Sequence, residues 1–194
     1  MTDLSADLSG LYKPIIFIGG APGTGKSTLA NLMLSRLDLD HRIGTGFVRA
    51  ILQSEASPEG EPQLFSSTFE SEDPAARVVW QAHRMRPAVA ACVDRARREG
   101  TSLVVEGSHL LPSVYADLAV DVFVVLAAPS EEEHARRIGG HRHAHRSIEA
   151  EGIGRIRQID DLYRRDASLA GVPVLAADAP LDDLVQALVA LLHR

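Results

Sequence analysis

The residues best suited to chemistry lie in a glycine-rich segment that reads Gly20-Ala-Pro-Gly-Thr-Gly-Lys-Ser27. It matches the pattern G-x-x-x-x-G-K-[ST] without a mismatch, with an apolar stretch before it and an amphipathic stretch after it. Glycines allow a tight turn in which successive backbone N–H groups point at a phosphate, and the following helix adds the partial positive charge of its N-terminus. We therefore expect this segment to bind a nucleotide through Gly20, Ala21, Pro22, Gly23, Thr24, Gly25, Lys26, Ser27 and Thr28.

Two side chains of this loop, and one acid beyond it, carry the expected catalytic chemistry. Lys26 would reach the β- and γ-phosphates, and the hydroxyl of Ser27 would ligate Mg²⁺. A second group for the metal is expected at the end of a neighbouring strand, where Glu106 follows the run Leu103-Val-Val105. Its carboxylate would hold Mg²⁺, directly or through a bound water, or orient a substrate hydroxyl. The alternative for Glu106 is a solvated acid at a strand end.

Arginines and histidines concentrate between Arg136 and Arg146, in a segment that two glycines interrupt. Phosphoryl transfer needs cations around the moving group and a lid that excludes water from it. We therefore expect residues 136–147 to form a short helical lid in which Arg142 and Arg146 are the catalytic cations. The alternative is a solvated basic turn.

Histidines in and near this segment raise the question of a metal site. The spacing of two residues between neighbouring histidines suits ligands on a strand, but the flanking pattern indicates a loop that leads into a helix. No H-E-x-x-H pattern accompanies these histidines. The histidines considered as metal ligands are His134, His141, His143 and His145. His109 lies on the loop after Glu106, and such strand-end loops face the ligand crevice in parallel sheets. The alternative for His109 is an ordinary polar loop residue.

The composition is that of an ordinary globular domain. The chain has 194 residues, of which 45% are hydrophobic and 24% are charged, and its net charge is −6. These values argue against disorder and against broad non-specific nucleic-acid binding. Cys92 is the only cysteine, so no intramolecular disulfide forms. The first residues do not resemble a signal peptide and no apolar run spans a bilayer, so we expect a cytoplasmic protein without membrane or nucleic-acid partners.

Short apolar runs that suit buried strands alternate with helical patterns along the chain. Residues 54–69 are rich in Ser, Glu, Pro and Gly and predict a loop, and Pro87 predicts a kink or break in a long helix. The alternation predicts one domain with a three-layer α/β P-loop fold and a five-stranded, mostly parallel sheet. Strands are expected over residues 15–18, 42–43, 102–105, 121–126 and 172–175, and the main helices over residues 26–37, 47–53, 74–99, 112–118, 148–169 and 181–193.

The assembled motifs resemble those of the 2-phosphoglycerate kinase family, from about Ile15 to Asp178. Since many families share the phosphate loop, the specific part of the resemblance lies in the Gly-Thr-x-x-x-Arg and Glu-Gly-x-His-Leu segments. The segments that carry it are Ile43-Gly-Thr-Gly-Phe-Val-Arg49, Phe65-Ser-Ser-Thr-Phe69, Val105-Glu-Gly-Ser-His-Leu110, Glu131-Glu-Glu-His134 and Ile156-Arg-Gln-Ile-Asp160.

The resemblance implies a nucleoside-monophosphate-kinase-like fold and transfer of the γ-phosphate of ATP to a small phosphorylated hydroxy acid. The favoured acceptor is 2-phosphoglycerate, which would give 2,3-bisphosphoglycerate, with Mg²⁺ as cofactor. Lys26 and Ser27 would bind ATP and Mg²⁺, and Arg142 and Arg146 would close from the lid. The acceptor would meet Arg49, Ser66, Ser67 and Thr68, while Glu106 to His109 would line the centre.

One departure from the family pattern keeps other functions open. Family members carry an acid where this chain has Gly46, and related small-molecule kinases use such an acid to orient or deprotonate the acceptor hydroxyl. Here that task would pass to Glu106, or the acceptor would be another small hydroxyl compound, such as a sugar acid or a biosynthetic intermediate. A nucleotide-binding regulator that transfers nothing is the alternative of another class. The choice between ATP and GTP, and between a monomer and a homodimer, stays open.

Overall fold

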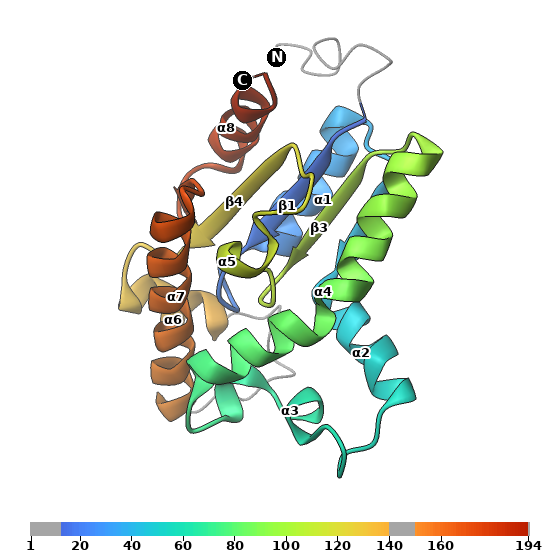
Figure 1. Cartoon of the computed structure of the whole chain (residues 1–194). Helices are drawn as coiled ribbons and strands as arrows, with labels where there is room; N and C mark the ends of the chain where they lie inside the picture. Colours follow the sequence, from blue (N-terminus) through green and yellow to red (C-terminus); the bar gives the residue numbers. More distant parts are fainter. Residues whose placement is uncertain (1–12, 140–149, 194) are drawn as a thin grey trace.

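The computed structural model describes residues 13–139 and 150–193. Within these residues, five strands form one sheet in the order β2-β3-β1-β4-β5, with every neighbouring pair parallel. Figure 1 shows its three central strands, β3, β1 and β4, side by side. The predicted α/β fold and its five-stranded sheet are confirmed, and the described sheet is parallel throughout. The strands are β1 (Ile15–Gly19), β2 (His41–Gly44), β3 (Leu103–Gly107), β4 (Val122–Ala127) and β5 (Val174–Ala176).

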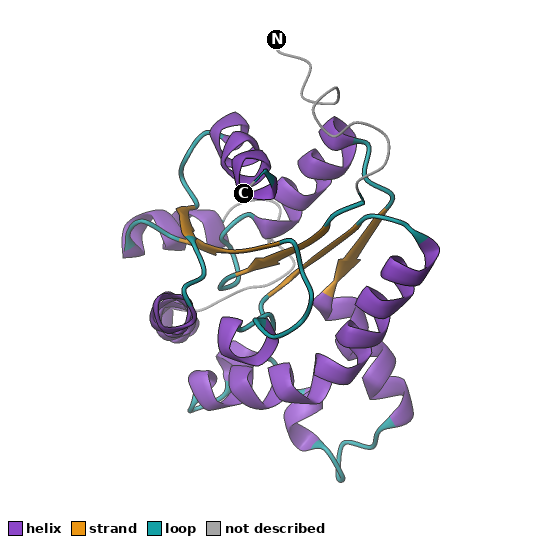
Figure 2. Cartoon of the chain, turned by 45° about the horizontal axis from the view of Figure 1, so that its top comes forward, coloured by secondary structure: helices purple, strands orange, loops and turns teal. Residues whose placement is uncertain are grey.

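Helices cover both faces of this sheet, which explains why its central strands are apolar on both sides (Figure 2). In β1, Ile15 and Phe17 point into one core, while Ile16 and Ile18 point into the other. The first core is shared with α2 (Thr45–Glu55), α4 (Pro74–Glu99), α5 (Pro112–Tyr115), α6 (Glu131–Ile138) and α7 (Ala150–Ala170). The second is shared with α1 (Lys26–Leu37) and α8 (Leu181–Leu192). No helix among the described residues has both the length and the apolar character needed to cross a membrane.

Residues 54–69, predicted as a loop, contain more structure than expected. They include the short helix α3 (Pro62–Phe65) and lead into the 3₁₀ turn η2 (Thr68–Glu70). The fully buried Gln81 of α4 holds this segment, because its side-chain amide donates to the carbonyl of Gln63 at 2.6 Å and to that of Ser66 at 3.1 Å. A contact between distant residues thus orders a stretch that has no local periodicity of its own.

Helix α4 is continuous from Pro74 to Glu99 although Pro87 lies inside it. Proline lacks the N–H that would bond the previous turn, and its ring crowds the carbonyl four residues earlier, so a bend is expected. Figure 1 shows α4 bending near its middle, so that the helix is kinked rather than broken. Gly100 ends the helix in the left-handed conformation with φ +64°, as the sequence predicted.

Candidate active site

The phosphate loop connects the central strand β1 to α1, as the motif predicted. Gly20, Gly23 and Gly25 all have positive φ, at +138°, +83° and +91°. These values favour glycine, and a Cβ atom on Gly20 would also collide with the carbonyl oxygen of Leu126 in β4. Glycine is therefore required here both for the turn and for the close approach of two strands.

Lys26 folds back over the loop from the first position of α1. Its ammonium Nζ donates to the carbonyl oxygen of Ala21 at 2.6 Å, and the side chain is nearly buried. The hydroxyl of Thr24 donates to the same carbonyl at 3.0 Å. Both side chains thus converge on the carbonyl of Ala21, and Lys26 brings a positive charge into the loop.

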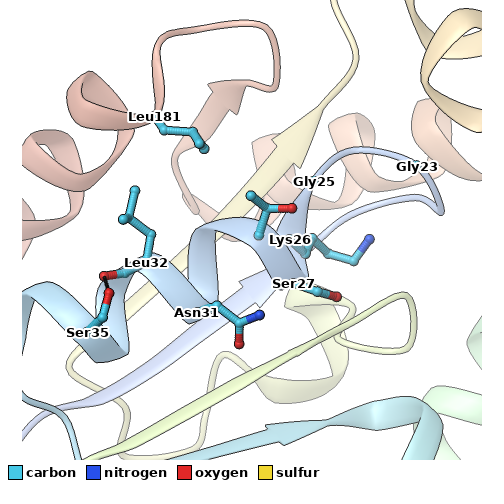
Figure 3. Close-up of a pocket in the computed structure, with 9 residues that line it drawn as sticks. Gly23, Gly25, Lys26, Ser27, Asn31, Leu32, Ser35 and Leu181 are labelled. Carbon is cyan, nitrogen blue, oxygen red and sulfur yellow. Dashed lines mark hydrogen bonds between the residues drawn. The ribbon is translucent and has the colours of Figure 1, made fainter. Parts of the chain in front are cut away.

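A first cavity of about 560 Å³ opens beside the loop along α1 (Figure 3). Its floor includes Gly23, Gly25, Lys26, Ser27 and Thr28, all of which the sequence assigned to nucleotide binding. Asn31, Leu32 and Ser35 extend it along one face of α1, and Leu181 at the start of α8 lies across from them.

A second cavity of about 840 Å³ also borders the loop and shares Gly23, Lys26 and Ser27 with the first. The β2–α2 junction, η2 and the end of β3 line it. The residues predicted to meet the acceptor are mostly brought together here, namely Arg49, Ser67, Thr68 and His109.

Ser66 is the exception among the predicted acceptor residues. It does not line the second cavity, and its hydroxyl donates to the carbonyl of Pro62 within α3 at 3.3 Å. The structure therefore places the Ser66 side chain against the end of α3 and away from the other residues predicted to meet the acceptor.

Glu106 lines the second cavity beside Ser27, with only 7% of its side chain exposed. Its Oε1 accepts a hydrogen bond from the Ser27 hydroxyl at 3.0 Å. The same oxygen forms an ion pair with Nη2 of Arg42 at 2.6 Å. Glu106 is thus not a solvated acid. The two predicted metal ligands are adjacent, and a serine hydroxyl beside a carboxylate is an oxygen donor set that suits Mg²⁺.

Arg42 was missed by the sequence analysis, which saw in it only part of a weak strand. It lines the second cavity from β2, and its Nε is buried without a hydrogen-bond partner among the described residues. The available signal was a charged residue inside a strand-like run, two positions before the strand ends at Gly44.

His109 is buried beneath the second cavity, and its Nδ1 lies 2.9 Å from the hydroxyl of Thr45. Burial, followed by the positive charges of Arg49 and Lys26, lowers the pKa of His109 to about 3. The imidazole is therefore neutral near pH 7 and serves as a hydrogen-bonding group rather than as a cation.

Thr45 reaches His109 because of Gly107. Gly107 has φ +154°, and a Cβ atom there would collide with the Thr45 hydroxyl. Gly46, the next residue of α2, also lines the cavity, but a Cβ atom on it would have nothing within 4 Å. The structure therefore has room for a larger side chain at position 46.

Most of the predicted lid lies outside the described residues, including Arg142, Arg146, His141, His143 and His145. Arg136 and Arg137 belong to α6, where both pair with Glu133, at 2.7 Å and 2.6 Å. No group of three or more histidine, cysteine, aspartate or glutamate residues that could hold a metal occurs within residues 13–139 and 150–193.

Comparisons with known proteins identify relatives of this chain. A family model described as an AAA domain matches residues 16–157. The chain is 30% identical to the 2-phosphoglycerate kinase of Methanocaldococcus jannaschii over 83% of its own length and 57% of that protein. It is 28% identical to that of Methanococcus maripaludis over 63% of its own length and 45% of the relative. The chain thus spans about half the length of these curated relatives.

Among solved structures, shikimate kinase from Acinetobacter baumannii, determined in complex with shikimate, superposes with a TM-score of 0.59 at 15% identity, with 97% of each chain covered. At this identity the likeness concerns the fold, which is that of a P-loop α/β domain. The family match and the curated relatives confirm the resemblance seen in the sequence motifs. The chain belongs to the AAA-domain family of P-loop proteins and is a relative of the 2-phosphoglycerate kinases.

Proposed function

We propose that this chain is an ATP-dependent kinase that transfers the γ-phosphoryl group to a hydroxyl of a small anionic acceptor, with 2-phosphoglycerate as the first candidate. One observation carries the proposal. Two cavities meet at Gly23, Lys26 and Ser27, so a nucleotide in one presents its terminal phosphate to a molecule in the other. A protein that only binds nucleotide has no need of the second cavity.

The donor side uses the backbone of the phosphate loop and the charge of Lys26 to hold the β- and γ-phosphates. Ser27 and Glu106 are the residues that would hold Mg²⁺, and the metal, when bound, supplies positive charge to the phosphate oxygens. The curated relatives are named kinases, which supports a nucleoside triphosphate as the donor, with ATP as the first candidate.

The acceptor side is lined by three basic residues, Lys26, Arg42 and Arg49, and two acidic ones, Glu70 and Glu106, although the chain as a whole is acidic. Arg42 and Arg49 line it and would bind the carboxylate and phosphate of the acceptor, which arginine recognises through paired N–H groups. The neutral His109 and the hydroxyls of Ser67 and Thr68 add hydrogen-bonding groups for the remaining oxygens.

In the transfer, the acceptor hydroxyl oxygen attacks the γ-phosphorus as the bond to the β–γ bridging oxygen breaks, and ADP leaves with that oxygen. Glu106 orients the hydroxyl, whose proton passes to solvent as the new P–O bond forms. Because such transfers depend on positioning and charge more than on a strong base, a carboxylate already paired with Arg42 is adequate.

A second candidate acceptor is another small hydroxyl compound, such as a sugar acid. The observation that favours it is Gly46, which leaves empty space where the 2-phosphoglycerate kinase pattern has an acid. Without that carboxylate, the cavity accepts a bulkier or more highly charged molecule at the same place.

The test is acceptor-dependent release of ADP from Mg-ATP, with 2-phosphoglycerate, 3-phosphoglycerate and a panel of sugar acids assayed in parallel. Lys26→Ala controls for contaminating activity, and Gly46→Asp restores the acid. Turnover with 2-phosphoglycerate that Lys26→Ala abolishes supports the first candidate. Turnover with another compound, together with a gain for 2-phosphoglycerate in Gly46→Asp, supports the second. Nucleotide binding without any acceptor-dependent turnover contradicts the kinase proposal.

A further inference from the structure

Outside the proposed donor and acceptor groups, one buried histidine contacts the phosphate loop. His134 of α6 is fully buried, and its Nε2 lies 2.7 Å from the carbonyl oxygen of Pro22. Its other ring nitrogen, Nδ1, lies 3.4 Å from Nη1 of Arg157 in α7. Both ring nitrogens of this histidine, which the sequence had raised as a metal ligand, thus have protein partners.

These two partners determine the tautomer of the ring. A guanidinium group only donates, so Nδ1 accepts from Arg157, and a carbonyl only accepts, so Nε2 carries the proton and donates to Pro22. Burial lowers the pKa of His134, and the charges of Arg157 and Lys26 act in the same direction, against the Pro22 hydrogen bond and Asp160. The ring is therefore neutral, with a single arrangement of its proton.

The carbonyl of Pro22 belongs to the same peptide group as the N–H of Gly23. No peptide bond in the described residues is cis, so this C=O and N–H point in opposite directions. Gly23 has φ +83°, and glycine at such a position leaves the peptide before it free to rotate between two orientations. We infer that His134 is a positioning residue for phosphoryl transfer, because its bond to Pro22 keeps the Gly23 N–H directed at the nucleotide phosphates.

The rest of α6 and α7 supports this contact. A Cβ atom at Gly23 would lie 2.7 Å from Cγ1 of Ile138, so α6 packs directly on the loop. Arg157 is held in turn by the fully buried Asp160, at 3.4 Å, and Asp160 also accepts from Arg164 at 3.0 Å and from the backbone N–H of Ala128 at 3.2 Å. Histidine and arginine are thus fixed before any ligand arrives.

The inference rests on nucleotide binding at this loop, which belongs to the proposed function, and the test separates the two. The dissociation constant of MgADP is measured by calorimetry for the wild type, His134→Ala, His134→Gln and the control His83→Ala, whose side chain is exposed on α4. Loss of one hydrogen bond that holds the loop is expected to weaken MgADP binding about tenfold in His134→Ala. The amide nitrogen of glutamine reaches the position of Nε2, so His134→Gln is expected to stay within about threefold of the wild type.

A purely structural role predicts a different pattern, in which thermal stability falls and His134→Gln is no better than His134→Ala. That pattern, or unchanged MgADP affinity in a folded His134→Ala protein, overturns the inference. Absence of MgADP binding by the wild type overturns the proposed function first. If His134→Ala does not fold, the MgADP dissociation constants of His134→Gln and the wild type are compared together with ¹⁵N chemical shifts of the wild-type ring: the inference requires near-equal affinities and protonated Nε2 with bare Nδ1, and much weaker binding by His134→Gln or the opposite tautomer contradicts it.

Discussion

A single carboxylate oxygen organises the centre of the candidate site. Oε1 of Glu106 accepts from both Ser27 and Arg42, which lie on different elements. Because a buried charge without a partner is costly, the ion pair with Arg42 offsets part of the cost of burying Glu106 in the free protein. The oxygen donors proposed for Mg²⁺ are therefore in place before a metal binds, and little reorganisation is needed when one does.

The buried His109 predicts how stability depends on pH. Its pKa in the folded protein is about 3, whereas the unfolded value is near 6.5, so the unfolded chain binds a proton that the folded chain does not. The contribution of neutral His109 to the free energy of unfolding is fully present above pH 6.5, and it is lost as the pH falls towards 3. Between pH 6.5 and 5, the free energy of unfolding of the wild type falls as the pH is lowered. His109→Gln is expected to make this slope shallower by up to about 1.4 kcal/mol per pH unit.

Urea unfolding at several pH values measures this slope. His83→Gln is the matched control, because it makes the same replacement at an exposed histidine of α4. Identical slopes for His109→Gln and the wild type would show that His109 accepts its proton in the folded state.

The site residues that could be predicted from the sequence are those that belong to a contiguous motif. The phosphate loop is a run of consecutive residues, so its pattern alone indicated Lys26 and Ser27. Arg42 was not predicted, because its partner Glu106 lies 64 residues away and the pairing depends on how β2 and β3 are aligned. The role of His134 was equally hidden, since its contact with Pro22 spans 112 residues.

At the scale of elements, the junction between β3 and α2 depends on Gly107. Gly107→Ala is expected to reduce stability by about 3 kcal/mol, because the methyl group collides with the Thr45 hydroxyl at a φ of +154°. Gly100→Ala is the matched control, since it also has positive φ, at +64°, but a Cβ atom there has nothing within 4 Å. It is expected to cost about 1 kcal/mol for the backbone conformation alone.

Urea unfolding of the two variants provides the comparison. Equal losses would mean that the close contact with Thr45 is unimportant and that only backbone conformation matters. Acceptor binding by Gly107→Ala should also weaken, because Thr45 and His109 are displaced together.

Most elements followed from local periodicity, and the exceptions have a common cause. The predicted strands and helices agree with the structure because buried strands and amphipathic helices have characteristic patterns. Helix α3 and the turn η2 were missed, since Gln81, a distant residue of α4, supplies the hydrogen bonds that order this segment. Pro87 was recognised locally, and only the three-dimensional structure showed that the helix bends and continues.

At the scale of the whole molecule, nucleotide binding is tied to global stability. The phosphate loop extends from β1, the central strand, which belongs to both cores. A ligand held by this loop therefore opposes unfolding of the entire domain. MgADP at about 100 times its dissociation constant is expected to add about 2.7 kcal/mol. For a domain of this size, that raises the Tm by roughly 5–10 °C.

Thermal unfolding with and without MgADP measures this shift, and Lys26→Ala is expected to lose most of it. A Tm that does not move at saturating MgADP would show that the ligand binds the unfolded chain as well, or that the loop opens separately from the domain.

The empty space beside Gly46 also bears on how this site changes over generations. Every glycine codon becomes an aspartate or glutamate codon when its middle base changes from G to A, so one point mutation places a carboxylate in this cavity. The backbone already accommodates the side chain, and the first turn of α2 favours an acid. The acid at position 46 can therefore be gained or lost through a single mutation. Selection then acts on the difference in function between the two forms, because the fold is the same in both.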